Sequence, residues 1–285
     1  MKITIAVPSK GRISEPSLKI LDKAGLGLKD NSNRKLISAT FNRNIDVMFA
    51  RASDIPKFVE NGIVDMGITG YDLIKESSSD VERLVDLNFG KTSLVIASPE
   101  DSDIESAKDL KDDMIVATEF PNLTQKYLDS LNLKCDIVEL SGSTEVAPAI
   151  GIADVITDLT STGETLKMNH LKVIDTILDS SIYLITNKKA LKEKNSLIEP
   201  ISTAVKGVIE AERKKLVLMN VARKYLEDVQ DVLTMRTPTV SEVLSEEETV
   251  AIQVVIDEDD VFELINDLRN AGARDILVMP IERII

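Results

Sequence analysis

One stretch of the sequence combines carboxylates, hydroxyls and a glycine in an order that suits phosphate and sugar chemistry. It runs from Asp154 to Leu166, and its first part, 153–157, is short, apolar and β-branched, as a buried strand is. Hydroxyl side chains and Gly163 follow, and a polar helical segment comes next. Where a strand leads through such a loop into a helix, backbone N–H groups of the loop and of the first helical turn are left unpaired, and the glycine lets the backbone approach an anion closely. The stretch therefore predicts an anion site.

The two carboxylates upstream of this loop, Asp154 and Asp158, indicate what else is bound there. Carboxylates beside a phosphate loop disfavour a second phosphate, whereas they suit ribose hydroxyls or a cation that develops at the anomeric carbon. We therefore predict a 5-phosphoribose site. The alternative is an ordinary capped helix after a strand, because Ser, Thr and Asp are common cap residues, and the stretch alone does not choose. The predicted phosphate loop consists of Thr160, Ser161, Thr162, Gly163, Glu164 and Thr165.

Polar and basic residues also follow three strands predicted in the first part of the chain, at 3–7, 45–50 and 64–68. Open α/β sheets bind ligands at the carboxyl ends of their strands, so these residues are expected to form one wall of a cleft. The alternative for the basic ones is solvated surface charge. The residues at these strand ends are Lys10, Arg12, Arg51, Thr69, Gly70 and Asp72.

The order of predicted elements indicates an α/β protein with two lobes and a smaller C-terminal domain. We expect the chain to leave the first lobe near residue 93 and to return near 182, which gives lobes at 1–92 with 182–212 and at 93–181. Two lobes joined by two crossings close around a ligand between them. Residues 213–285 follow a β-α-β-β-α-β order, the ferredoxin-like pattern of small domains that regulate or oligomerise.

Composition excludes several classes of protein. The net charge is −14, and the last 46 residues, 240–285, carry −9 of it, which argues against nucleic-acid binding through a general basic surface. A single cysteine excludes an intramolecular disulfide and fits a reducing cytosol. No apolar run approaches the roughly 20 residues that span a bilayer, so we expect a cytoplasmic protein without a membrane partner.

Several motifs together resemble the long form of ATP phosphoribosyltransferase, the first enzyme of histidine biosynthesis. The resemblance covers essentially the whole chain, with order and spacing kept. Departures are small: Thr160 stands where Val is common, and Ser143-Thr144 stands where Ser-Val is usual. The matching stretches are 8–12 (PSKGR), 51–56 (RASDIP), 67–72 (GITGYD), 86–90 (DLNFG), 139–148 (ELSGSTEVAP), 154–166, 238–239 and 272–282.

This resemblance implies a catalytic core like the two-lobed periplasmic binding proteins and a C-terminal domain similar to ACT regulatory domains. It implies that ATP and phosphoribosyl pyrophosphate give N1-(5-phosphoribosyl)-ATP and pyrophosphate, with Mg2+ required. It further implies feedback inhibition by histidine and homo-oligomers, both dimers and hexamers.

The resemblance also suggests a role for each candidate residue. The loop 160–165 would take the 5′-phosphate, and Asp158 would contact the ribose hydroxyls with Asp154 behind it. Mg2+ would be held mainly by substrate oxygens and water, since no compact carboxylate cluster is evident in the sequence. The residues assigned to ATP or pyrophosphate are Lys10, Arg12, Arg51, Thr69, Gly70, Asp72, Glu139 and Glu145, and those assigned to histidine are Met235, Thr237, Thr239, Val255 and Asp275.

Two other functions fit parts of the sequence. A non-catalytic solute sensor with an appended effector domain would share the two lobes, although Asp158 and the hydroxyl-rich loop argue against it. A phosphoribosyltransferase for another base would share the loop.

Overall fold

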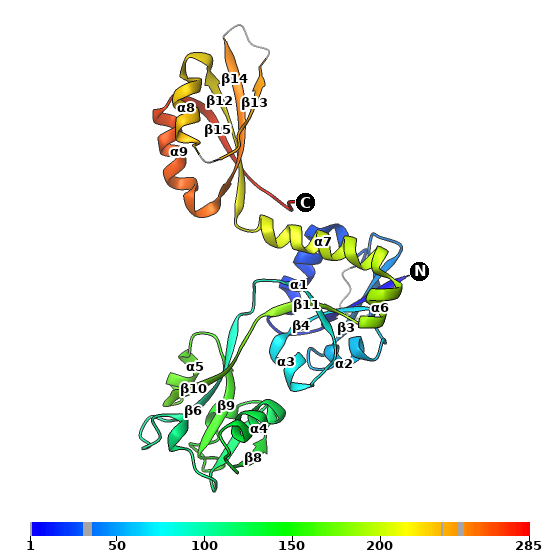
Figure 1. The fold of residues 1–285 in the computed structure, drawn as a ribbon, viewed down its shortest axis with the longest axis vertical. Helices are drawn as coiled ribbons and strands as arrows, with labels where there is room; N and C mark the ends of the chain where they lie inside the picture. Colours follow the sequence, from blue (N-terminus) through cyan, green and yellow to red (C-terminus); the bar gives the residue numbers. More distant parts are fainter. Residues whose placement is uncertain (1, 31–35, 235, 244–247) are drawn as a thin grey trace. The chain divides into compact units, whose positions relative to one another are not determined.

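The computed structural model describes residues 2–30, 36–234, 236–243 and 248–285 (Figure 1). By its contacts the chain divides into two compact units. The first comprises the residues up to Asp22 together with Leu26–Ser202, and the second comprises Lys23–Gly25 with Thr203–Ile285. The first unit contains two sheets, each with its own helices, which we call lobe I and lobe II; the four-stranded sheet of the second unit belongs to the C-terminal domain. The domain ranges expected from the sequence stay predictions.

Lobe I is built on a six-stranded sheet in the order β2-β3-β1-β4-β11-β5. Strand β1 pairs in parallel with β3 and β4 and is buried at every position except Thr4, which fits its otherwise apolar sequence. The strands are β1 (Ile3–Pro8), β2 (Ile37–Ala39), β3 (Ile45–Ala50), β4 (Met66–Gly70), β5 (Glu82–Asp86) and β11 (Ile182–Thr186). The helices are α1 (Ser14–Leu21), continued by a π-helical turn at Asp22–Leu26, α2 (Ile55–Glu60), α3 (Tyr71–Glu76), α6 (Lys188–Glu193) and the first part of α7 (Asn195–Ala211). The middle of the π-helical turn and the part of α7 from Thr203 on belong to the second unit.

Lobe II has a five-stranded sheet in the order β10-β6-β9-β7-β8. Strand β7 pairs in parallel with both β8 and β9, so the carboxyl ends of these three strands share one edge. The strands are β6 (Thr92–Pro99), β7 (Ile115–Thr118), β8 (Asp136–Glu139), β9 (Val155–Thr160) and β10 (Leu171–Ser180), and the helices are α4 (Pro121–Ser130) and α5 (Glu164–Met168). Single 3-10 turns occur at Ala107–Asp109 and Thr144–Val146.

Two features of lobe II have no clear signal in the local sequence. Strand β10 was not predicted, because its side chains face solvent at several positions and leave no clean apolar alternation. After β8 only the 3-10 turn Thr144–Val146 forms, and Gly151, at a φ of 74°, follows soon after it.

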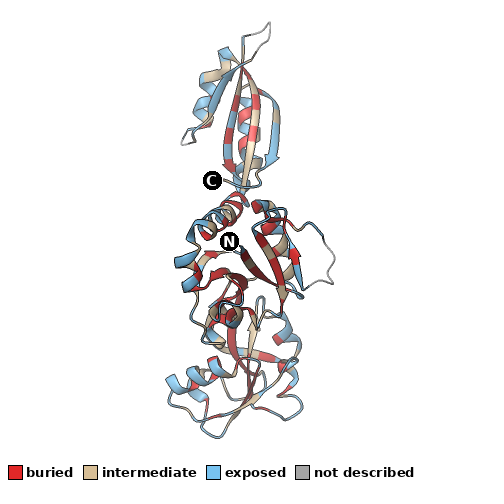
Figure 2. Cartoon of the chain, turned by 90° about the vertical axis from the view of Figure 1, so that its right-hand side faces the viewer, coloured by how far each residue is buried: buried red, intermediate tan, exposed pale blue. Residues whose placement is uncertain are grey.

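The C-terminal domain is an antiparallel sheet in the order β13-β14-β12-β15, the ferredoxin-like arrangement expected from the sequence. Its core lies between one face of the sheet and the two helices, and alternate strand positions are buried accordingly (Figure 2). The elements are β12 (Lys214–Ala222), a 3-10 turn at Arg223–Tyr225, α8 (Leu226–Val232), β13 (Thr239–Glu242), β14 (Thr249–Asp257), a 3-10 turn at Glu258–Asp260, α9 (Val261–Asn270) and β15 (Ala273–Pro280). The predicted fold class is therefore confirmed.

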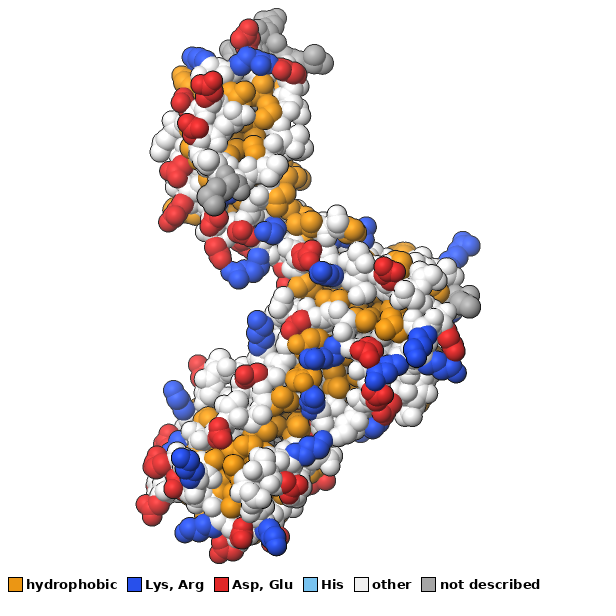
Figure 3. Space-filling model, viewed as in Figure 1, with side chains coloured by type: hydrophobic (Ala, Val, Ile, Leu, Met, Phe, Trp, Pro, Cys, Tyr) orange, Lys and Arg blue, Asp and Glu red, His pale blue; other side chains and the backbone are white. Residues whose placement is uncertain are grey.

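On the face drawn in Figure 3, Lys and Arg side chains are interspersed with Asp and Glu rather than gathered into one stripe. Within the described ranges, no helix combines the length and the apolar character that crossing a bilayer requires.

Candidate functional site

The predicted phosphate loop connects β9 to α5 at the carboxyl edge of the lobe II sheet. Gly163 has a φ of 76°, a conformation that glycine adopts without steric cost. The loop's own hydroxyls hold its shape: the Gly163 N–H donates to Thr160 Oγ1 at 2.9 Å, and the Glu164 N–H lies 3.5 Å from Thr162 Oγ1. Because α5 has only five residues, its dipole adds little, and an anion here would rely on N–H groups and hydroxyls.

Asp158 lies within β9 rather than in the loop, two residues before its end at Thr160. Its Oδ1 accepts a hydrogen bond of 2.7 Å from the Leu159 N–H. Burial raises the pKa of the Asp158 carboxyl to about 6; the Leu159 hydrogen bond opposes this rise, and the nearby charges of Glu119 and Glu145 add to it. A half-buried carboxyl whose pKa lies near neutrality is typical of functional sites.

The structure separates the two aspartates that were predicted to act together. Asp154 precedes β9, at the end of the strand opposite to the loop, and four extended residues put its Cα about 13 Å from that of Asp158. Asp154 Oδ2 accepts the Ile115 N–H at 2.8 Å, and the Asp154 N–H donates to the Ile115 carbonyl at 2.9 Å. These bonds join the starts of β7 and β9. Asp154 is therefore a residue of the sheet edge remote from the loop.

The basic residues of lobe I follow two strands that lie side by side, and their role in binding stays a prediction. Strands β1 and β3 are parallel with Pro8 opposite Ala50, so Lys10, Arg12 and Arg51 follow two neighbouring strand ends. The Ser9 N–H donates to the Ala50 carbonyl at 2.8 Å, which ties the two loops at their origin. All three basic side chains are exposed and accessible to an anion.

The polar residues at the end of β4 form hydrogen bonds within the protein. Thr69 is fully buried, and its hydroxyl donates to the Ala52 carbonyl at 3.2 Å. Asp72 is also buried; its Oδ1 accepts the Ser180 hydroxyl at 2.6 Å, and its N–H donates to that hydroxyl oxygen at 3.0 Å. Gly70 precedes α3, where a Cβ would meet the Asp72 carboxylate at 2.1 Å. In this structure Asp72 fastens α3 to the second crossing and Thr69 binds the segment after β3, and the assignment of all three residues to ATP stays a prediction.

Three glutamates lie along the carboxyl edge of the lobe II sheet. Glu139 ends β8 and Glu145 lies in the following 3-10 turn, and both had been assigned to substrate. Glu119, which follows β7, was missed by the sequence reasoning. Its place directly after a strand of the same sheet was the signal that could have identified it, and its charge acts on Asp158.

A cavity of about 380 Å³ lies between the two lobe crossings and the phosphate loop, with Ser161 in its wall. Lys91, from the crossing between β5 and β6, lines the same cavity. Strands β6 and β9 pair with Ser93 opposite Thr160, which brings the residues before Ser93 alongside the loop. Asp179 also lines the cavity and accepts the Ser93 hydroxyl at 2.6 Å. Lys91 was not predicted, because only this antiparallel pairing brings it near the loop.

The residues assigned to histidine lie on or near the uncovered face of the C-terminal sheet, except Met235, which is outside the described residues. Thr237 and Thr239 are exposed, and Val255 is opposite Leu216 on β12. Asp275 Oδ2 accepts the Asn220 side-chain N–H at 3.1 Å. Leu216 and Asn220 are four residues apart on β12, so Val255 and Asp275 lie about 13 Å apart along the strand direction. Val255 and Asp275 therefore do not meet in one compact pocket of this chain, and the histidine assignment stays a prediction.

Comparison with known protein families identifies two matching models. The model described as ATP phosphoribosyltransferase (HisG) matches residues 51–207, and the model of the HisG C-terminal domain matches residues 211–283.

Curated relatives match along their whole length. An ATP phosphoribosyltransferase from Methanothermobacter thermautotrophicus is 57% identical over 286 residues, which cover 100% of both chains. One from Methanocaldococcus jannaschii is 52% identical over 288 residues, which cover 99% of this chain and 100% of that one. Among solved structures, the ATP phosphoribosyl transferase (HisG:HisZ) complex from Thermotoga maritima aligns with a TM-score of 0.63 and 28% identity, covering 71% of this chain and 98% of that chain.

Proposed function

This chain belongs to the ATP phosphoribosyltransferase family in its long form, and from that premise we propose that it joins ATP to 5-phosphoribosyl 1-pyrophosphate. The products would be N1-(5-phosphoribosyl)-ATP and pyrophosphate, in the first step of histidine biosynthesis. The observation that carries the proposal is the hydroxyl-rich loop after β9, with Asp158 half-buried two residues before the strand ends.

The reaction requires the protein to stabilise positive charge on the ribose ring, and the position of Asp158 suits this role. N1 of adenine is a weak nucleophile, so bond breaking at the anomeric carbon leaves positive charge on the ribose ring. The ionised Asp158 carboxylate is held in a partly desolvated place beside the loop, where its attraction for that charge is strengthened. The main contribution of the protein is thus positioning and electrostatic stabilisation.

The basic residues have complementary roles. In lobe I, Lys10, Arg12 and Arg51 would hold the triphosphate or the departing pyrophosphate at the strand edge that they share. Lys91 would provide positive charge next to the loop, where Asp158 and three glutamates otherwise make the field negative. Of the two aspartates, only Asp158 retains a proposed role toward ribose; Asp154 would maintain the pairing of β7 and β9.

Magnesium is proposed to arrive with the substrate. Among the described residues no group of three or more His, Cys, Asp or Glu side chains has the geometry of a metal site. Substrate oxygens and water suit an ion that keeps much of its hydration, and bound Mg2+ would neutralise the pyrophosphate.

We propose that histidine regulates the enzyme by binding to the C-terminal domain. The enzyme would be a cytoplasmic homo-oligomer, and its subunits would respond together. The uncovered sheet face carries Thr239 and Val255, but the wide spacing of the proposed contacts argues for a pocket completed by another subunit. A Thr239→Trp variant should lose histidine inhibition and keep turnover, since Thr239 is exposed and outside the catalytic unit. Inhibition that stays intact in this variant would place the effector site elsewhere.

The activity is tested by incubating the chain with ATP, phosphoribosyl pyrophosphate, Mg2+ and pyrophosphatase while following the absorbance of the product. Omitting either substrate should abolish the signal, and other nucleobases in place of ATP should give none. Binding of both substrates without turnover would instead favour a sensor. Turnover with another base would place the chain among other phosphoribosyltransferases.

A further inference from the structure

A second basic cavity of about 390 Å³ lies apart from the proposed catalytic residues. It is formed by α3, the turn that follows it, the start of β5, and one side chain of α4. The side chains that matter are Tyr71, Lys75 and Arg83 from lobe I, with Lys126 from lobe II. None of them belongs to the phosphate loop, and of the four only Tyr71, between Gly70 and Asp72, adjoins a strand end described above.

The charge of this cavity is opposite to that of the protein. Three cations line it, in a chain whose net charge is −14. Asp80 is the one carboxylate among the described lining residues, and Lys188 Nζ pairs with its Oδ1 at 2.5 Å. Lys75, Arg83 and Lys126 also line the cavity, and none of these three cations is neutralised by an ion pair with a described residue.

Aromatic rings fix the central cation. The Arg83 guanidinium carbon lies 4.6 Å from the centre of the Tyr71 ring and 5.1 Å from that of Tyr183, and the two ring centres are 5.9 Å apart. Lys75 Nζ lies 5.2 Å from the Tyr71 ring centre. Cations held against rings lose little further freedom when they bind an anion. Because these cations already contact Tyr71, the cavity suits a phosphate chain better than a stacking base.

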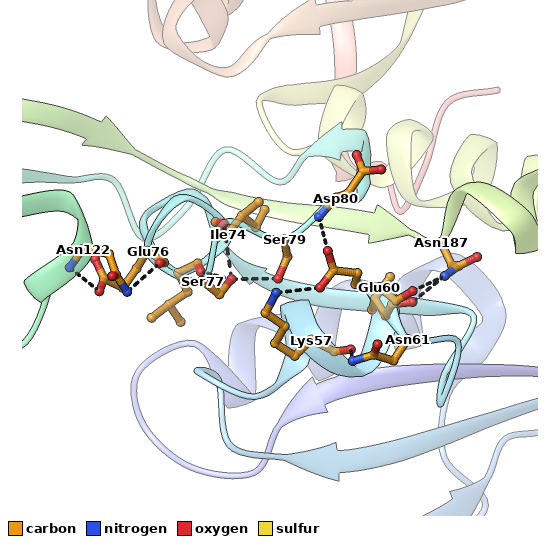
Figure 4. A network of polar contacts seen from close by, with 12 residues as sticks. Lys57, Glu60, Asn61, Ile74, Glu76, Ser77, Ser79, Asp80, Asn122 and Asn187 are labelled. Atoms are coloured by element: carbon orange, nitrogen blue, oxygen red, sulfur yellow. Dashed lines mark hydrogen bonds and ion pairs between the residues drawn. The ribbon is translucent and has the colours of Figure 1, made fainter. Parts of the chain in front are cut away.

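The frame of the cavity is braced from both lobes, as Figure 4 shows. The Asp80 N–H donates to Glu60 Oε1 at 2.8 Å, and the hydroxyls of Ser77 and Ser79 are 2.8 Å apart. Across the lobe boundary, Glu76 accepts the backbone N–H groups of Asn122 and the next residue at 2.8 Å each.

Lys126 extends this link into the cavity. Its Nζ donates to Ser78 Oγ at 2.9 Å, which positions the ammonium group and leaves further N–H donors free for a ligand. A ligand that bridges Arg83 and Lys126 would therefore contact both lobes at once.

We propose that this cavity binds a polyanion of the pyrophosphate class, separately from the catalytic cleft. The ligand contacts Lys75 and Arg83 from lobe I and Lys126 from lobe II. By bridging α3 and α4 it favours the lobe arrangement in which these helices touch. The inference does not depend on the proposed catalytic activity.

Isothermal titration of the full chain with inorganic pyrophosphate, without Mg2+, tests the site. The wild-type chain should bind a pyrophosphate here in addition to one in the cleft. A double variant with Arg83→Gln and Lys126→Gln should lose the additional site, or bind there at least roughly tenfold more weakly, and keep the other. The single variant Lys126→Gln, which leaves the Arg83–Tyr71 contact in place, should give a smaller loss of the same site. A double variant with Lys108→Gln and Lys134→Gln, two exposed lysines of lobe II, makes the same change of charge and should bind as wild type does.

Tyrosine fluorescence locates the binding. The chain has four tyrosines and no tryptophan, and Tyr71 and Tyr183 are the two in contact with Arg83. Pyrophosphate should change the emission of the wild-type and control chains, and the change should be smaller in the Arg83→Gln, Lys126→Gln chain, where only binding in the cleft, whose cavity Tyr183 also lines, remains. A double variant that binds pyrophosphate with the same number of sites, affinity and emission change as the wild type would overturn the proposal, whether or not the cleft also binds pyrophosphate without Mg2+.

Discussion

Replacing Asp158 by Asn should make the protein more stable and less active, a pair of opposite effects that follows from the burial of this carboxyl. The asparagine has nearly the same shape, and its Oδ1 can still accept the Leu159 N–H. What it removes is the negative charge, which the folded protein holds at a cost because burial and two neighbouring glutamates raise the pKa to about 6.

The size and the direction of the effect on stability follow from the shift in the pKa of Asp158. A folded-state pKa of about 6, against an ordinary value of 3.8, means that the folded chain binds more protons than the unfolded chain between these pH values. The contribution of Asp158 to stability is therefore complete below pH 3.8 and falls as the pH rises to about 6, by roughly 3 kcal/mol in all. The stability of the Asn variant relative to wild type should thus grow by about 2 kcal/mol between pH 4.5 and pH 8.

Urea unfolding at these two pH values, followed by circular dichroism, measures the stability change. Asp103→Asn, at an exposed position of lobe II, is the control and should give no pH-dependent difference. In steady-state assays, wild-type kcat/KM should rise with pH to a plateau with an apparent pKa near 6. The Asn variant should lose that dependence, and its kcat should fall by about 10²-fold or more with a smaller change in KM. A variant that is less stable than wild type at pH 8, or that keeps wild-type kcat, would refute the reasoning.

Other positions give further predictions. Gly163→Val should raise KM for phosphoribosyl pyrophosphate strongly with the fold retained. A residue with a side chain at a φ of 76° lowers stability by roughly 1–2 kcal/mol, but no atom lies within 4 Å of the added Cβ. Gly151→Val, at a φ of 74° and equally open, should lose similar stability and keep its KM; equal kinetic effects in both variants would remove the loop from phosphate binding. Lys91→Gln should raise the same KM by about tenfold and Lys91→Arg by much less, and equal KM values in the two variants would show that the charge is not used. Gly272→Ala should lower the melting temperature of the C-terminal domain, because its φ is 102° and a Cβ would meet Tyr225 Cγ at 2.7 Å; turnover should survive, and an unchanged melting temperature would contradict the strain.

Features encoded over a few neighbouring residues could be predicted from the sequence. Apolar β-branched runs identified β1, β3 and β9, because a strand buried in a sheet needs such side chains whatever its partners are. The loop around Gly163 was recognised from composition, and the order of elements after 213 predicted the ferredoxin-like sheet.

Which residues meet in space was decided by the tertiary structure. Asp154 and Asp158 look alike in the sequence, but β9 runs on to Thr160 and puts one aspartate at each end of the strand. Asp72 was expected in the cleft, yet its carboxylate binds Ser180, a residue 108 positions away that only the fold brings near. Lys91 reaches the loop because β6 pairs with β9, and the pKa of Asp158 depends on glutamates from two other segments. Strand pairing and burial are properties of the assembled sheet, so a local pattern can identify the chemical groups of this site but not their partners or their ionisation.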